Sequence, residues 1–257
     1  MAPLSKFSAP GAAAGQNTPP DPDTFMKAAL AHDDKLLRGY IVQGANPNLP
    51  DGKKRLPLHA ALRVKDDKNL QAALAALLAG GANPNLIDNS GDAGKTAFMA
   101  AIAAGRDDKT LTALLRAGAN PLLEEDVGLP TLHYLALQGR YAVLEAARAA
   151  GVDMNHRDSA GRTCLMSAAR EGFARTVEVL LECGADPAAR DEKGFTVLQH
   201  AHSAPPESDR KEVLRLLTRA LSETGIRSEL RQLRAEVDTL SRVVGDIVED
   251  PSPEKDS

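Results

Sequence analysis

Histidine and cysteine are the side chains of this chain best suited to bind zinc or to attack a substrate. The six histidines and two cysteines are His32, His59, His133, His156, His200, His202, Cys164 and Cys183. Zinc sites need four ligands, which usually come as closely spaced pairs. Only His200 and His202 lie that close, and nothing nearby completes the set. The sequence therefore predicts no metal site. The two thiols are too few for a disulfide framework and are interpreted as small core residues.

The acidic residues and the short catalytic motifs give no sign of an active site. The chain has no G-x-S-x-G nucleophile motif and no phosphate-binding P-loop. Paired carboxylates occur at Asp33–Asp34, Asp66–Asp67 and Asp107–Asp108. Each pair falls in an expected loop between helices, where solvated carboxylates are common. We expect a protein that is not an enzyme and that uses no cofactor.

The composition limits the partners and the compartment. The chain has 257 residues, a formal net charge of -4, 43% hydrophobic residues, 3% aromatic residues and no Trp. It has no dense Lys/Arg block and no apolar run near the ~20 residues of a membrane span, so we expect no nucleic-acid and no membrane binding. The expected compartment is the reducing cytoplasm, with a secreted effector that uses a non-cleaved signal as the alternative. With so few rings, the core must be built from Ala and Leu, which suits closely packed helices.

Two short phrases recur along the chain at a fixed spacing. "GANPNL" begins at Gly44 and Gly81, and variants begin at Gly118, Gly151 and Gly184, so the starts step by 37, 37, 33 and 33 residues. A second phrase recurs in phase, as "LPLHAAL", "TAFMAAI", "TLHYLA", "TCLMSAA" and "TVLQHA". A period of this size indicates a repeat architecture.

The clearest unit covers residues 158–190 and predicts a turn, a helix, a loop and a second helix. "TCLMSAAREG" predicts a helix that ends near Gly172, and "ARTVEVLLECG" predicts a helix that ends at Gly184. The second glycine fits a backbone conformation that disfavours a Cβ, and the Asn or Asp that follows can hydrogen-bond its own turn. One unit cannot bury its apolar face alone, but stacked neighbours can.

These phrases resemble the ankyrin repeat, whose pattern of D-x-x-G-x-T-P-L-H, A-A, two helices and G-A-D matches residues 158–186 closely. The resemblance covers residues 23–221 and implies an all-α, ankyrin-repeat α-solenoid. We count six units, which begin near Asp23, Asp51, Asp88, Glu125, Asp158 and Asp191. The first and last units depart most from the pattern and are interpreted as capping repeats. The histidine of the second phrase is kept only as His59 and His133, and the resemblance implies that both bond turn backbone.

The resemblance also implies that the hairpin tips and first helices line a concave face that binds other proteins. The tips of the middle units are apolar, at Leu49, Leu86, Ile87, Leu122, Leu123, Val127 and Leu129. Clustered exposed aliphatic residues often mark partner sites, although some of these can simply pack against the next hairpin. The end tips are basic, at Lys53, Lys54, Arg55, Arg157, Arg162, Arg190 and Lys193. Together with the aromatic residues Tyr134 and Phe195, this pattern favours a peptide with an aliphatic core and acidic flanks.

Residues 226–248 predict a short coiled coil. Apolar residues alternate at spacings of four and three, at Ile226, Leu230, Leu233, Val237, Leu240, Val244 and Ile247. In a parallel pair, Glu229 faces Arg234 across the interface, which favours a weak parallel homodimer. The alternative is a helix that folds back on the last repeat or binds a different protein. Residues 1–22 and 249–257 are expected to be disordered tails.

The sequence as a whole predicts a non-enzymatic scaffold that binds one or more partner proteins through its concave face and self-associates through the coiled coil. Two alternatives stay open. One is a secreted bacterial effector that masks a host protein, and the other is an enzyme regulator or immunity-type inhibitor that blocks one active site.

Overall fold

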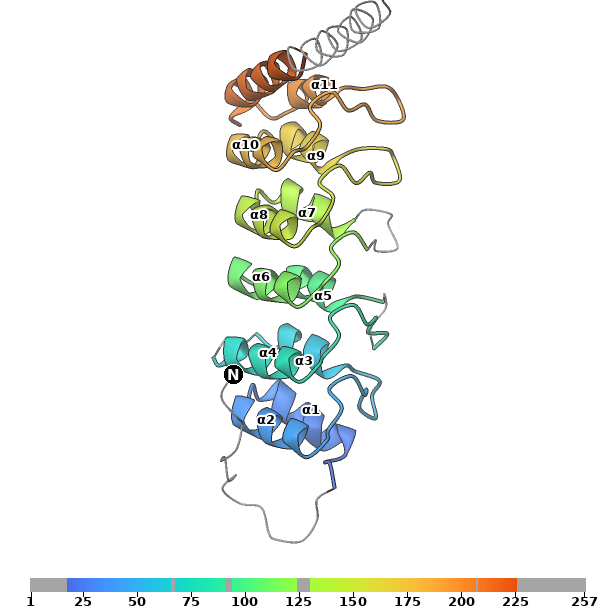
Figure 1. Ribbon diagram of the computed structural model, residues 1–257. Helices are drawn as coiled ribbons and strands as arrows, with labels where there is room; N and C mark the ends of the chain where they lie inside the picture. Colours follow the sequence, from blue (N-terminus) through green and yellow to red (C-terminus); the bar gives the residue numbers. More distant parts are fainter. Residues whose placement is uncertain (1–17, 66–67, 91–93, 124–129, 207, 226–257) are drawn as a thin grey trace, which may run out of the picture.

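In the computed structural model of this protein, the residues described are 18–65, 68–90, 94–123, 130–206 and 208–225. Helices stack in pairs into a long, two-layered rod (Figure 1). The first layer holds α1 (Pro22–Leu30), α3 (Pro57–Arg63), α5 (Ala97–Ala103), α7 (Thr131–Leu137), α9 (Cys164–Glu171) and α11 (Val197–His202). The second layer holds α2 (Asp34–Val42), α4 (Leu70–Ala79), α6 (Asp108–Arg116), α8 (Tyr141–Ala149) and α10 (Ala174–Glu182). A further helix occupies residues 210–225.

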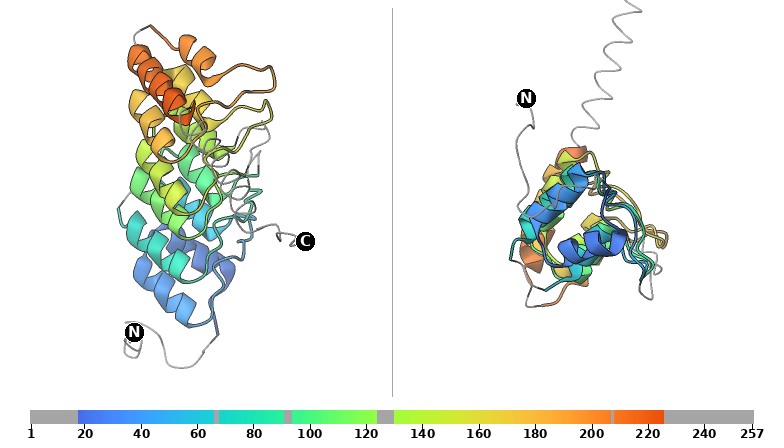
Figure 2. Two further views of the ribbon diagram at one scale, coloured as in Figure 1. Left: turned by 45° about the horizontal axis from the view of Figure 1, so that its top comes forward. Right: turned by 90° about the horizontal axis from the view of Figure 1, so that it is seen from below.

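Turns join the second helix of each pair to the first helix of the next, and the described residues of these turns project from one side of the rod. Seen along the stack, these turns overlie one another (Figure 2, right). Within the described ranges the backbone forms no strand; it forms only isolated antiparallel bridges, between Asp88 and Lys95, Arg157 and Thr163, and Arg190 and Thr196. The expected all-helical solenoid is confirmed.

The first helices begin where the sequence supplies a capping side chain. The hydroxyl groups of Thr96, Thr163 and Thr196 accept a hydrogen bond from the backbone N–H three residues later, at the starts of α5, α9 and α11. Pro57 occupies the first turn of α3, where a missing N–H costs nothing. Asp107 caps the second-layer helix α6 in the same way as the threonines.

The second helices end as the recurring glycine phrase predicts. Gly44, Gly81, Gly118, Gly151 and Gly184 have φ between 84° and 93°, the left-handed region that a Cβ disfavours. The Asn or Asp two residues later then accepts a hydrogen bond from the backbone two residues further on, for example Asn83 Oδ1 from Asn85 N at 2.9 Å. The chain thereby reverses direction after each second helix and leads into the turn before the next helix pair.

The core runs the length of the rod between the two layers and contains little aromatic surface. Neighbouring first-layer helices pack as α1 with α3, α3 with α5, α7 with α9, and α9 with α11. The largest fully buried side chains are mainly leucines, with Phe98 and Met26, and many alanines are buried beside them. The core of small and aliphatic residues expected from the composition is therefore observed.

Candidate binding face

The turns that project from the first layer form a continuous surface, which we call the hairpin face. It consists of residues 49–56, 86–90, 94–96, 122–123, 156–163 and 189–196 together with the exposed side of the first-layer helices. The rod presents this face along its whole described length (Figure 1). Most of the residues predicted to bind a partner lie on it. Val127 and Leu129 lie outside the described residues, as do all the coiled-coil positions from Ile226 to Ile247.

The aliphatic residues of the hairpin face differ in how much they expose. Ile87 is 59% exposed and Leu49 is 48% exposed, so both offer apolar surface to a partner. Leu86, Leu122 and Leu123 are half-buried. Leu122 packs against the hydrophobic core, so part of its surface is already used within the chain. Leu49 and Ile87, from successive turns, therefore carry most of the exposed aliphatic surface on this part of the face.

Two aromatic residues border the same face. Phe195 is 46% exposed, and its ring meets the imidazole of His200 edge-on, with 6.4 Å between the ring centres. Tyr134 lies on α7 and is half-buried. Phe195 thus offers a rigid aromatic surface near the last described turn, of the kind enriched in protein interfaces.

Arg55 and Arg162 are each tied to an aspartate of their own turn. Arg55 Nη2 lies 2.6 Å from Asp51 Oδ2, and Arg162 Nη2 lies 2.7 Å from Asp158 Oδ2. Burial alone would raise the pKa of the Asp158 carboxyl, but hydrogen bonds from the Arg162 side chain and from the turn backbone outweigh it, so the pKa is lowered. The same balance lowers the pKa of Asp51. Both arginines brace their turns, and only part of each remains available to a partner.

Arg157 and Arg190 make a different set of bonds. Arg157 Nη1 donates to the carbonyl oxygens of Gly161 and Arg190, and Arg190 Nη1 donates to Gly194 O at 3.0 Å. Both residues are exposed, and neither forms an ion pair with a carboxylate in the described part of the chain. Their positive charge therefore remains uncompensated on the hairpin face.

Four aspartates, three of them buried and Asp191 half-buried, hold these turns, and their role was not predicted from the sequence. Two backbone N–H groups of the same turn donate to the carboxylate at each of Asp51, Asp158 and Asp191. Asp88 accepts one such bond, from Ser90, and forms an ion pair with Arg63 at 3.0 Å. His200 Nε2 lies 3.0 Å from Asp191 Oδ2, so this histidine links α11 to the last described turn. These aspartates occupy the same position in successive repeat units, and this recurrence in the sequence is the signal that indicates their role.

The histidines of the second phrase are buried between helix and turn. His59 Nε2 lies 3.0 Å from Lys95 O, a turn carbonyl, as the resemblance implied. His133 Nδ1 lies 3.3 Å from Ser167 Oγ on α9. Burial lowers the pKa of His59, and it lowers that of His133 to about 4, so both rings are neutral near pH 7.

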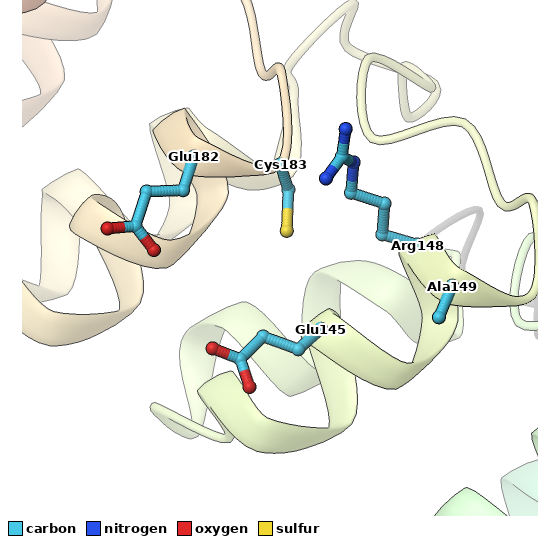
Figure 3. A pocket seen from close by; sticks show the side chains of 5 residues that line it. All are labelled: Glu145, Arg148, Ala149, Glu182 and Cys183. Atoms are coloured by element: carbon cyan, nitrogen blue, oxygen red, sulfur yellow. The ribbon is translucent and has the colours of Figure 1, made fainter.

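The arrangement offers little for catalysis. Across the described ranges, no three His, Cys, Asp or Glu residues gather as a metal site would require. Cys164 is buried, which raises its pKa to about 12, and burial also raises the pKa of Cys183. A shallow hollow between α8 and α10 is lined by Glu145, Arg148, Ala149, Glu182 and Cys183 (Figure 3). Its thiol is protonated near pH 7 and is therefore a poor nucleophile.

Comparison with known proteins agrees with this geometry. Residues 132–227 match the family model for ankyrin repeats in three copies. A stretch of 73 residues is 42% identical to ankyrin repeat domain-containing protein 13B of Mus musculus and of Homo sapiens. That stretch covers 28% of this chain and only 12% of those proteins. No helix in the described ranges is long and apolar enough to cross a membrane.

Solved structures extend the likeness over most of the chain. The crystal structure of an ankyrin repeat domain from Acinetobacter baumannii superposes with a TM-score of 0.63 at 28% identity, covering 78% of this chain and 98% of that one. A second ankyrin repeat protein superposes with a TM-score of 0.60 at 22% identity, covering 77% and 98%, and shows the shared fold. Turns, two-helix units and stacking thus agree with the repeat phrases read from the sequence.

Proposed function

Since this chain is an ankyrin-repeat protein, we propose that it works without catalysis, by binding another protein through the hairpin face. Ankyrin repeats are a protein–protein interaction module, and the observation that carries the proposal here is the exposed pair Ile87 and Leu49. At 59% and 48% exposure, these side chains leave apolar surface in water unless a partner covers it.

The charges beside this aliphatic surface favour a partner segment that is aliphatic in its centre and acidic at its ends. Arg157 and Arg190 keep their charge at one end of the hairpin face, and Lys53 and Lys54 are exposed at the other. Opposite charges at the rim of an interface mainly raise the association rate and select the partner. Phe195 adds aromatic surface at the Arg190 end.

We also propose that residues 226–248 join two copies of the chain as a weak parallel coiled coil. The support is the heptad spacing in the sequence, and two hairpin faces on one dimer would raise avidity without new contacts. Both cysteines are free thiols, which fits the reducing cytoplasm as the proposed compartment. Light scattering tests the dimer: Leu233→Pro should lower the mass, and an unchanged mass would contradict the coil.

The hairpin-face proposal is tested by capturing the partner from native lysate with the full chain. Leu49→Glu combined with Ile87→Glu should remove a partner that the unaltered chain retains, because two charges would then face apolar partner surface. Leu36→Glu is the matched control, because Leu36 is 47% exposed but lies on α2 in the second layer. Equal retention by all three chains would contradict the proposal.

A further inference from the structure

Three residues other than glycine adopt the left-handed backbone conformation in the described ranges. They are His32 with φ of 50°, Lys54 with φ of 62° and Asn69 with φ of 62°. A side chain in this region crowds the backbone and destabilises the fold relative to glycine. Where a protein keeps such a residue, either the residue type or a contact normally explains it.

Two of the three are accounted for within the chain. His32 is buried, and its Nε2 lies 2.8 Å from Ala61 O on the next helix pair. Asn69 precedes α4, and asparagine is one of the few side chains that tolerate this conformation well. Each therefore has a structural reason to stand where it does.

Lys54 stands where equivalent turns use glycine. Lys54 N donates to Asp51 O at 2.9 Å, and the same 2.9 Å bond joins Gly161 N to Asp158 O and Gly194 N to Asp191 O. Gly161 and Gly194 have φ of 72° and 79°. The three turns thus share one backbone shape, and the first alone places a lysine at the strained position.

No contact within the described chain explains this lysine. Lys54 is exposed, and its ammonium takes part in no hydrogen bond or ion pair among the residues that the structure describes. The neighbouring Asp51 carboxylate is already paired with Arg55, and Asp23 accepts a hydrogen bond from Gly52 N at 2.9 Å. Lys53 beside it is exposed too. The two ammonium groups therefore point into solvent from the tip of a rigidly bonded turn.

We propose that Lys54, together with Lys53, binds an acidic side chain of the partner and so anchors an acidic end of the bound peptide at the first turn. The inference rests on the proposed function of the hairpin face and makes it more specific. Leu49 immediately precedes this turn and Ile87 follows on the next, so the partner's aliphatic residues would continue from its acidic end along the rod. Charge complementarity, rather than shape, selects the acidic residues at this end.

The test separates strain from binding with two substitutions at one position. Lys54→Gly removes the strain and the charge, and Lys54→Gln removes only the charge. We expect Lys54→Gly to raise the Tm by about 2–4 °C and Lys54→Gln to leave it nearly unchanged. Both should weaken binding of an acidic peptide by about fivefold, the effect of one exposed ion pair.

The probe is a fluorescein-labelled peptide of three glutamates followed by five residues of Leu, Ile and Ala, measured by anisotropy with the full chain. A peptide with glutamines in place of the glutamates should bind more weakly, and added salt should abolish the difference. Lys35→Gln is the matched control, because it removes an exposed lysine from α2 in the second layer, outside the hairpin face. It should change the affinity for the peptide by less than twofold.

Ile87→Glu distinguishes this inference from the proposed function. Loss of peptide binding in Ile87→Glu with unaltered binding in both Lys54 variants would overturn the role of Lys54 and leave the hairpin face standing. Unaltered binding in all three variants would contradict both. A Tm that does not rise in Lys54→Gly, or equal binding of the glutamate and glutamine peptides, would also overturn the inference.

Discussion

The side-chain amide of Asn85 joins its own turn to Gly118, the glycine that begins the next turn. Asn85 Nδ2 donates to Gly118 O at 2.8 Å, and Asn85 Oδ1 accepts from Asn120 N at 2.8 Å. Asn48 makes the same two bonds to Gly81 O and Asn83 N, and Asn155 makes them to Gly184 O and Asp186 N. In the unit between those of Asn85 and Asn155, Leu122 occupies the equivalent position, and its side chain can neither donate nor accept a hydrogen bond. At the three joints that have this Asn, its amide links one turn to the next and so helps to shape the hairpin face.

Removing one of these amides should loosen the rod at that joint. Asn85→Ala leaves two backbone groups without their partners, and we expect the free energy of unfolding to fall by about 1–2 kcal/mol. Urea unfolding followed by circular dichroism measures it. Asn89→Ala is the control, since Asn89 is exposed and makes no hydrogen bond in the described structure. Equal losses in the two variants would contradict a linking role for Asn85.

The same substitution at two glycines should have opposite effects. Gly39 lies inside α2, and a Cβ there meets nothing within 4 Å, so Gly39→Ala should stabilise the fold by about 0.5–1 kcal/mol. At Gly161, φ is 72° and a Cβ would lie 2.9 Å from Glu192 N, so Gly161→Ala should destabilise it by about 1–3 kcal/mol. Thermal unfolding of both variants checks the signs; a stable Gly161→Ala would disprove the close packing of the last two described turns.

Acid should destabilise the protein through His133. Burial lowers the pKa of His133 to about 4, although the nearby negative charge of Asp158 acts to raise it. In the unfolded chain the pKa of a histidine is near 6.5. The unfolded chain therefore binds the extra proton first as the pH falls. Stability is fully present above pH ~6.5 and declines towards pH ~4, by up to about 3 kcal/mol from this group.

His133→Met should flatten the pH dependence of unfolding between those values. Methionine is already present at the equivalent positions Met99 and Met166, whose sulfur atoms accept a backbone N–H bond. His202→Gln is the control, because His202 is exposed. A pH profile unchanged by His133→Met would show that the ring is not held neutral.

The two thiols should differ in reactivity only through their burial. Burial raises the pKa of both Cys164 and Cys183, so neither should react quickly with iodoacetamide at pH 7. Cys183 is half-buried and should be labelled slowly in the native protein, while Cys164 should be labelled only on unfolding. Mass spectrometry after timed labelling measures both rates. Rapid labelling of Cys183 would indicate an activated thiolate that the structure does not explain.

The local features of the fold could be predicted from the sequence because each depends on a few adjacent residues. Gly172 and Gly184 mark helix ends in the left-handed conformation, and Thr163 caps α9, all where the repeat phrases place them. The link from Asn85 to Gly118 could not be predicted from one unit, because it joins residues 33 positions apart that become neighbours only after stacking.

The hairpin face was predicted in outline but not in its electrostatics. The sequence predicts that Arg55 and Arg162 bind the acidic flanks of a partner, whereas the structure pairs each with an aspartate four residues earlier. That spacing has no fixed meaning outside a helix, since the turn shape decides whether the two side chains meet. Aligning the units on Asp51 and Asp158 would have suggested the pairing. The same alignment places Lys54 at the position that Gly161 and Gly194 occupy in their units.

Hydrogen exchange of the full chain with and without its captured partner tests the central claim most directly. We predict that partner binding slows exchange of backbone amides in the hairpin face, at residues 49–56, 86–90, 156–163 and 189–196, and leaves the second-layer helices α4, α6 and α8 unchanged. Protection confined to those second-layer helices, with the turns unaffected, would contradict binding through the hairpin face.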